Sequence, residues 1–132
     1  MRSTDTGPMV AVRQFIDGLN GANVELALAA CVDDMAIVDD FPPHEWVGPG
    51  AASGWFGQMA ILSAEFGMSE ISVALSEPRH VTITDDRAYV VVPIDCRWLD
   101  NGAAAQRSGA LTVALRDGQP GWRISVLTWS WD

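Results

Sequence analysis

Residues 39–50 read Asp39-Asp40-Phe41-Pro42-Pro43-His44-Glu45-Trp46-Val47-Gly48-Pro49-Gly50, and this stretch decides the fold. The Pro42-Pro43 pair prevents a strand from continuing through the centre of a sheet, because proline has no backbone N–H to donate. The turn sequence Gly48-Pro49-Gly50 predicts that a helix begins directly after it. The stretch therefore predicts a corner between a strand and a helix, with two acidic residues where the strand ends.

Two helices and one strand are predicted before this corner. Apolar residues at helical spacing predict an amphipathic helix over residues 8–19, with Pro8 in its first turn. Asn23 is a suitable cap for a second, alanine-rich helix that ends near Cys31. Residues 35–41 are then predicted to form a short strand, and one face of that strand carries Met35, Ile37, Asp39 and Phe41.

A third helix and then only strands are predicted after the corner. The apolar face of this helix consists of Trp55, Phe56, Met59, Leu62 and Phe66. Turn sequences such as Asp100-Asn101-Gly102 separate the strands, which cover residues 71–77, 80–84, 89–99, 106–116 and 122–131. This order predicts an α+β fold in which one curved sheet wraps around the helices.

Length and composition predict one domain over residues 8–132, preceded by a flexible tail over residues 1–7. The chain has 132 residues, of which 48% are hydrophobic, and that is enough for a core. No apolar run reaches the length of about 18 residues that a membrane span needs. The N-terminus also lacks the apolar run of a signal peptide, so we expect a cytoplasmic protein with no membrane partner.

The charge balance excludes some classes of partner. The formal net charge is −9, from 8 basic and 17 acidic residues, whereas nucleic acids favour a basic surface, so no nucleic-acid partner is expected. All basic residues are Arg, which excludes a Schiff-base lysine. Cys31 and Cys96 are predicted to be buried, reduced thiols. The scattered His and Cys residues have no metal-ligand spacing, and we expect neither a metal nor a cofactor.

Four features carry a resemblance to a known superfamily. They are Asp33-Asp34 at the start of the first strand, the acid at its end, Gly48 before the third helix, and Trp122-Arg123-Ile124 with an aromatic tail. Over residues 8–132 the chain thereby resembles the nuclear transport factor 2-like superfamily, which includes ketosteroid isomerases, SnoaL-type polyketide cyclases, scytalone dehydratase and limonene epoxide hydrolase. The resemblance implies a cone-shaped, strongly curved and mostly antiparallel sheet wrapped around three N-terminal helices. It also implies a pocket between the concave sheet face and the helices, and a homodimer through the outer sheet face. It leaves Trp98, Trp129 and Trp131 as either dimer contacts or caps of the core.

Asp39 is the first candidate for catalysis, because the resemblance places it where ketosteroid isomerases have their general base. A carboxyl group that faces an apolar cavity has a raised pKa, which suits removal of a proton next to a carbonyl. Those isomerases also use a Tyr on the first helix and a protonated Asp on a late strand. Here Phe15 occupies the Tyr position and residues 109–115 contain no acid. The alternative is that Asp39 and Asp40 only terminate the strand.

Four further residues are candidates for acid–base or orienting roles. Asp95 and Arg97 share one strand face, and similar pairs occur in epoxide hydrolase and cyclase sites; the alternative is a surface ion pair. His80 precedes Asp95 at a separation that resembles the His–Asp pair of SnoaL-type cyclases. His44 lies in the corner that would roof the pocket, although both histidines are also compatible with plain exposure to solvent.

The leading hypothesis is a cofactor-independent isomerase, cyclase or dehydratase that acts by acid–base chemistry on a hydrophobic, carbonyl-bearing small molecule. The alternative is a non-catalytic ligand-binding or dimeric interaction module of the same fold. The expected catalytic residues are Asp39, Asp95, Arg97, His80 and His44. The expected pocket-lining residues are Phe15, Phe41, Trp46, Trp55, Phe56 and Met59.

Overall fold

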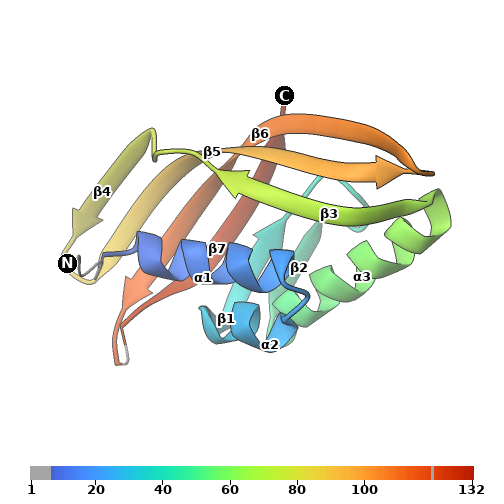
Figure 1. The fold of residues 1–132 in the computed structure, drawn as a ribbon. Coiled ribbons are helices and arrows are strands. Elements are labelled where there is room, and N and C mark those ends of the chain that lie inside the picture. The colour runs from blue at the N-terminus through green and yellow to red at the C-terminus, as the bar shows by residue number, and fades with distance from the viewer. Residues whose placement is uncertain (1–6, 120) are drawn as a thin grey trace.

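The computed structural model describes residues 7–119 and 121–132, in which three helices lie on one side of a seven-stranded sheet (Figure 1). The elements are α1 (Met9–Asn20), α2 (Val24–Ala29), β1 (Cys31–Val38), β2 (Glu45–Gly48), α3 (Ala51–Phe66), β3 (Met68–Leu75), β4 (His80–Thr84), β5 (Arg87–Asp100), β6 (Ala103–Asp117) and β7 (Trp122–Trp131). This order confirms the predicted α+β class. The tail predicted over residues 1–7 lies, except for Gly7, outside the described residues.

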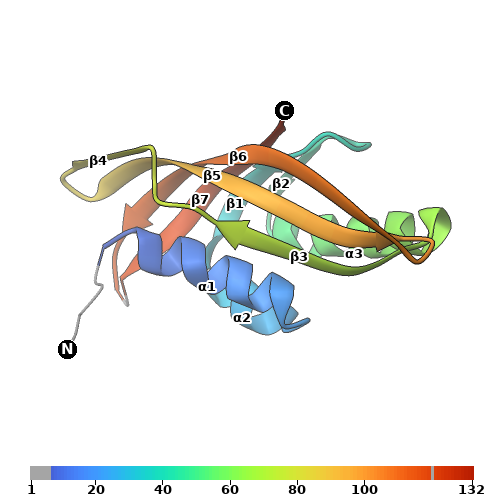
Figure 2. The ribbon, with the colours of Figure 1, turned by 45° about the horizontal axis from the view of Figure 1, so that its top comes forward.

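The sheet is antiparallel except at one pair of strands. Its order is β2-β1-β7-β6-β5-β3, and β4 pairs with β5 off this path. The parallel pair is β1 and β7, where Val38 lies opposite Thr128. The end of β1 therefore lies beside the C-terminal part of β7. The long strands β5 and β6 bend over the helices, as Figure 2 shows, and the concave side of the sheet faces the helices.

Alternation along β5 decides which of its side chains enter the core. Its buried residues are Ala88, Val90, Val92, Ile94 and Cys96. The residues between them, Asp95 among them, therefore lie on the outer face of the sheet. The side chains that meet this inner face from the helices include Val12, Phe15, Ile16 and Trp55, all of which are buried. The core is thus a single layer between the concave sheet face and the helices.

The predicted corner between strand and helix is present, with one addition. Residues 45–48, which begin one residue after the prolines, form the short strand β2, and its Trp46 lies opposite Ile37 of β1. Pro42 and Pro43 precede this edge strand, so the backbone groups of β2 remain able to pair. The two prolines therefore do not prevent a strand from forming after them. The predicted cap of α2 is confirmed, because the Asn23 side chain accepts a hydrogen bond from the Leu26 backbone N–H at 3.2 Å.

Gly109 marks a close approach between β6 and β7. A methyl group at Gly109 would collide with the Ser130 carbonyl oxygen and lie 3.1 Å from Cα of Trp131. Gly109→Ala is therefore expected to destabilise the protein by about 1–3 kcal/mol, because the backbone of β7 has to move. Gly57→Ala in α3 is the matched control: nothing lies within 4 Å of its added methyl group. This control should stabilise the helix by about 0.5–1 kcal/mol. Urea unfolding compares the two variants, and effects of the same sign would contradict the close approach.

Candidate functional site

A cavity of about 370 Å³ lies between the concave sheet face and the helices. Its wall is mainly apolar, and the aromatic residues on it are Phe41, Trp55, Phe66, Trp98, Trp129 and Trp131. The charged residues on it are Asp39, Asp40 and Arg107. An apolar cavity of this size with a few polar groups is typical of a site for a small molecule.

Asp39 directly follows β1, and its carboxyl group lies on the cavity wall with 7% of the residue exposed. Its Oδ2 accepts a hydrogen bond from Trp55 Nε1 at 2.9 Å. Its Oδ1 accepts hydrogen bonds from Trp131 Nε1 at 3.1 Å and from the Asp40 backbone N–H at 2.7 Å. Donors from α3 and β7 therefore hold both carboxylate oxygens in one orientation.

The pKa of Asp39 is raised above its ordinary value. Burial is the main cause, and the neighbouring charge of Asp40 adds to it. The hydrogen bonds from Trp55, Trp131 and the Asp40 backbone act in the opposite direction, because they favour the ionised carboxylate. A carboxylate with a raised pKa is a stronger base than an exposed aspartate, which suits the removal of a proton from carbon.

A stack of indole rings positions the hydrogen-bond donors of Asp39. The Trp129 ring stacks on Trp55 at a centroid distance of 5.2 Å and on Trp131 at 5.9 Å. Trp55 and Trp131 donate to Asp39, whereas the buried N–H of Trp129 has no hydrogen-bond partner among the described residues. Phe15 supports the stack from behind, with its ring 6.0 Å from that of Trp55. The orientation of Asp39 thus depends on the aromatic core.

Arg107 of β6 is the cation on the described part of the cavity wall. Its guanidinium carbon lies 5.2 Å from the centroid of the Trp131 ring. Its Nη2 lies 3.8 Å from Oδ2 of Asp40, and both side chains are substantially exposed. Trp131 therefore contacts Asp39 through its N–H and Arg107 through its ring face.

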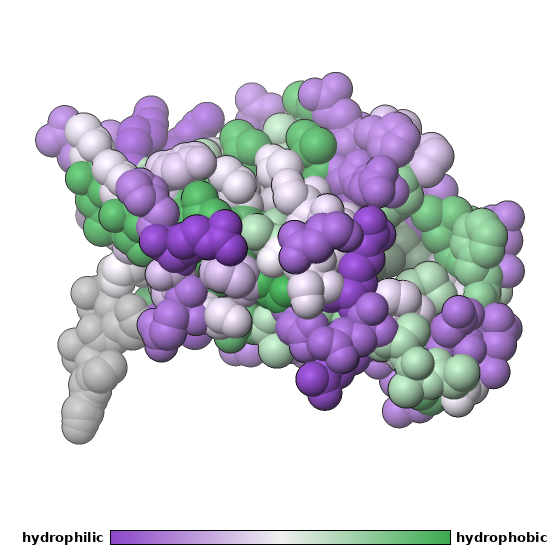
Figure 3. Space-filling view, turned by 90° about the horizontal axis from the view of Figure 1, so that it is seen from above, coloured by the Kyte–Doolittle hydropathy of each residue, from purple (hydrophilic) through white to green (hydrophobic). Residues whose placement is uncertain are grey.

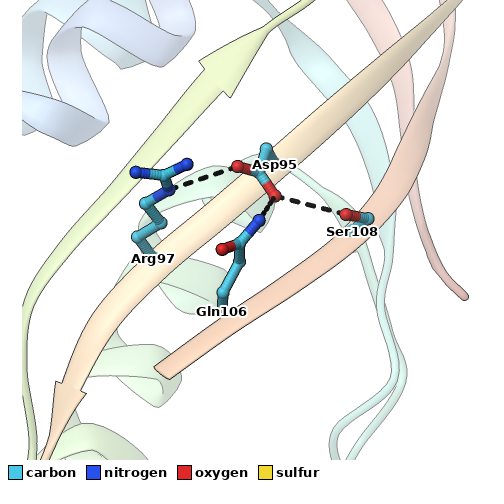
Figure 4. A network of polar contacts seen from close by, with 4 residues as sticks. All are labelled: Asp95, Arg97, Gln106 and Ser108. Atoms are coloured by element: carbon cyan, nitrogen blue, oxygen red, sulfur yellow. Dashed lines mark hydrogen bonds and ion pairs between the residues drawn. The ribbon is translucent and has the colours of Figure 1, made fainter. Parts of the chain in front are cut away.

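The structure does not bring Asp95 and Arg97 into the cavity, which corrects the expectation that this pair faces the pocket. Arg97 Nε donates to Asp95 Oδ2 at 3.3 Å on the outer face of the sheet (Figure 4). Gln106 and Ser108 of β6 donate to Asp95 Oδ1 at 2.7 and 3.2 Å. These hydrogen bonds, the one from Gln106 foremost, lower the pKa of Asp95, although partial desolvation opposes them.

The outer face of the sheet, which carries the Asp95 cluster, is the surface through which a homodimer was predicted. Seen from above in Figure 3, hydrophilic residues lie over the middle of the molecule beside neutral and hydrophobic ones. The homodimer through the outer face of the sheet stays a prediction. Trp98, Trp129 and Trp131, considered for that contact, instead line the cavity on the inner face.

Neither histidine lies on the wall of the cavity. His44 is exposed in the corner, with its Nδ1 3.1 Å from the backbone carbonyl oxygen of Asp39. His80 is exposed on β4, where its Nε2 lies 2.6 Å from Thr82 Oγ1. No hydrogen bond or ion pair in the described part of the chain joins His80 to Asp95, so the expected dyad is not formed.

The expected pocket-lining residues divide into two groups. Phe41, Trp55 and Met59 lie on the cavity wall. The other three lie behind it or beside it: Phe15 is fully buried, Trp46 packs on Phe41 at 5.2 Å, and Phe56 packs on Trp55 at 4.9 Å.

Sequence reasoning missed Trp129, Trp131 and Arg107 as residues of the site. The period-two pattern in β7 contained a usable signal, because Leu127, Trp129 and Trp131 share one strand face. No local sequence pattern indicates that the Arg107 side chain points inward. Its orientation follows from the pairing of β5 with β6, which places Arg107 opposite the inward-facing Cys96.

Cys96 also lies on the cavity wall, and its thiol is protonated at neutral pH. Burial is the main reason that its pKa is raised to about 11. Burial likewise raises the pKa of Cys31 to about 12. Both thiols are free and buried, as predicted, and such thiols are poor nucleophiles.

Residues 7–119 and 121–132 contain no group of three His, Cys, Asp or Glu side chains placed to hold a metal ion. The helices of the same residues are all too short or too polar to cross a membrane.

Solved structures, but not sequences, relate this chain to known proteins. No protein-family model matches it, and no curated protein matches it significantly in sequence. A ketosteroid isomerase-like protein from Erwinia carotovora atroseptica SCRI1043 matches with a TM-score of 0.71 and 16% identity, over 94% of this chain and 92% of that one. A nuclear transport factor 2-like superfamily protein from Salmonella enterica serovar Typhimurium LT2 matches with a TM-score of 0.76 and 14% identity, over 92% and 86%.

A hexachlorocyclohexane dehydrochlorinase, LinA type 2, matches with a TM-score of 0.76 and 12% identity, over 94% of this chain and 84% of that one. Identities this low relate the folds and leave the activity open. Because these structures each match more than nine-tenths of the chain, and the curved sheet encloses its cavity with three helices, the protein has the nuclear transport factor 2-like fold.

Proposed function

We propose that the protein is a cofactor-independent enzyme that uses Asp39 as a general base on a hydrophobic, carbonyl-bearing small molecule. The observation that carries this proposal is a carboxyl group with a raised pKa on the wall of an otherwise largely apolar cavity. The apolar wall would bind the hydrocarbon part of the substrate. The reaction would be an isomerisation, cyclisation or dehydration that begins with the loss of a proton next to the carbonyl.

The fixed orientation of Asp39 supports this role. A base whose oxygens are already held by Trp55 and Trp131 loses little freedom when the substrate binds, which favours proton transfer. Structures of the same fold include a ketosteroid isomerase-like protein and a hexachlorocyclohexane dehydrochlorinase, whose names refer to reactions of small, largely apolar molecules. These neighbours support the substrate class and leave the reaction itself to be tested.

The test is the exchange of α-protons of small aryl ketones, such as indanone and tetralone, in D₂O. We expect the protein to accelerate the loss of the α-proton NMR signal relative to buffer at the same pH. Asp39→Asn should lose this acceleration. Asp95→Asn is its matched control, because it replaces a carboxyl group by an amide on the outer face of the sheet, and it should retain the full rate. Binding of the ketones without acceleration would reject catalysis and favour the alternative of a ligand-binding module.

A further inference from the structure

We propose that Arg107 binds a carboxylate of the ligand, so that the cavity selects apolar oxo acids over neutral ketones. The proposal deepens the proposed function, on which it rests for the position of the reacting carbon beside Asp39. Its test is a binding measurement, which does not require turnover.

The position of Arg107 leaves its hydrogen-bond donors available. Arg107 lies opposite Cys96 in the β5–β6 pair and lines the cavity. Its guanidinium rests over the Trp131 ring, a cation–π contact that holds the charge in place but uses none of its N–H groups. Within the described residues Arg107 makes no hydrogen bond. A guanidinium has five N–H donors in a planar fork, and a carboxylate accepts two of them side by side.

Asp40 does not satisfy these donors. The 3.8 Å between Arg107 Nη2 and Asp40 Oδ2 is longer than a hydrogen bond, and the side chains are 45% and 66% exposed. An exposed ion pair at this distance contributes little. A ligand carboxylate with bidentate geometry would therefore displace Asp40 from Arg107 at small cost.

The geometry also places the cation beside the base. The indole of Trp131 carries the guanidinium on its face and donates its N–H to Asp39 at 3.1 Å. One ligand could thus place its carboxylate on Arg107 and its carbonyl next to Asp39, with its apolar part against the remaining wall. Because Arg107 is about half exposed, the ion pair would form at the mouth of the cavity, where neither charge is fully desolvated.

The net charge of the protein does not favour acidic ligands, so a preference for them depends on Arg107 itself. A formal charge of −9 repels anions from the molecule as a whole, and Asp39 and Asp40 add negative charge at the cavity. Preference for an acid over its neutral analogue must therefore come from Arg107. Removal of Arg107 should reverse that preference, because the remaining charges on the described part of the wall are acidic.

The test compares indanone carboxylic acid with its carboxamide, two ligands that share the ring and the ketone. Titration calorimetry should show that the wild-type protein binds the acid about tenfold more tightly than the amide. Arg107→Gln should reverse this preference, because the acid then binds more weakly than the amide, while the affinity for the amide stays unchanged. Arg97→Gln makes the same substitution on the outer face and should retain the preference. Asp40→Asn should tighten binding of the acid, because it removes a competing carboxylate.

Two results would overturn the proposal: equal affinities for acid and amide in the wild-type protein, or an acid preference that survives in Arg107→Gln. A preference for the acid that persists in a protein without exchange activity would support the role of Arg107 and reject the proposed catalysis. Arg107→Lys separates charge from geometry, since lysine keeps the charge but lacks the planar fork. We expect it to restore only part of the preference.

Discussion

Asp39→Asn is expected to lower the rate of ketone α-proton exchange by about 10²–10⁴-fold, the usual contribution of a general base. The amide of Asn accepts no proton at neutral pH, but it has nearly the shape and volume of the carboxyl group. We therefore expect kcat to fall while the ketone still binds. NMR exchange rates at saturating ketone, compared with the rates for wild type and Asp95→Asn, measure the effect. An Asp39→Asn variant with the wild-type rate would remove Asp39 from the mechanism.

The pH dependence of the same reaction follows from the raised pKa of Asp39. Only the ionised carboxylate accepts a proton, so the wild-type rate should rise with pH and level off above the pKa of Asp39. That midpoint should lie above about 3.9, the pKa of Asp in an unfolded chain. The residual rate of Asp39→Asn should show no such midpoint. A wild-type rate without a midpoint would contradict the assignment of the base.

The sign of the corresponding stability effect is opposite to that of a salt-bridged aspartate. Because the folded pKa is raised, the folded state binds the Asp39 proton more tightly than the unfolded chain does. The stabilisation that comes from protonated Asp39 is fully present below the pKa of this residue in the unfolded chain. It is lost as the pH rises through the pKa of Asp39 in the folded state. Urea unfolding across this window should therefore show wild type losing stability relative to Asp39→Asn.

Trp55→Phe is expected to destabilise the protein by about 1.5–3 kcal/mol more than Trp129→Phe, the contribution of a hydrogen bond to a charged group. The two indoles are 1% and 4% exposed and stack on each other, and phenylalanine keeps an aromatic ring at either position. Only the Trp55 N–H has a partner, Oδ2 of Asp39, whereas the Trp129 N–H has none in the described residues. Urea unfolding at neutral pH measures the difference.

A second readout separates the hydrogen bond of Trp55 from its packing. Loss of this donor should raise the pKa of Asp39 further, since the bond favours the ionised carboxylate. The midpoint of the exchange rate should therefore move to higher pH in Trp55→Phe, and by more than in Trp129→Phe, which keeps both indole donors of Asp39. Equal destabilisation and equal midpoints in the two variants would show that the Trp55 hydrogen bond contributes nothing.

The local patterns of the sequence predicted every helix and strand of the described residues except β2, although β1 begins at Cys31 rather than at residue 35. The strand bounds His80–Thr84 and Trp122–Trp131 agree with the structure residue by residue, because turn or proline signals flank the first strand and a turn sequence precedes the second. The cap at Asn23 was predictable because its hydrogen bond reaches only to Leu26. The pattern placed Asp39 on one face with Met35 and Ile37, and the structure buries all three residues.

The local pattern could not predict which face of β5 points into the core. Apolar residues occupy both of its faces, with Val90 and Val92 on one and Val91 and Pro93 on the other. A period-two pattern then fits either orientation equally well. Packing against the helices turns Cys96 and Trp98 inward, and Asp95 with Arg97 consequently lies outside.

Sequence alone thus predicted the order of the three helices and the strands other than β2, and the acid that follows β1, because these depend on neighbours along the chain. Only the tertiary structure decided what surrounds that acid. The parallel pairing of β1 with β7 brings Trp131 to Asp39 across 92 positions, and β6 carries Arg107 to the ring of Trp131. Contacts between residues so distant depend on strand pairing and on the bend of the whole sheet, which no local pattern of residues records.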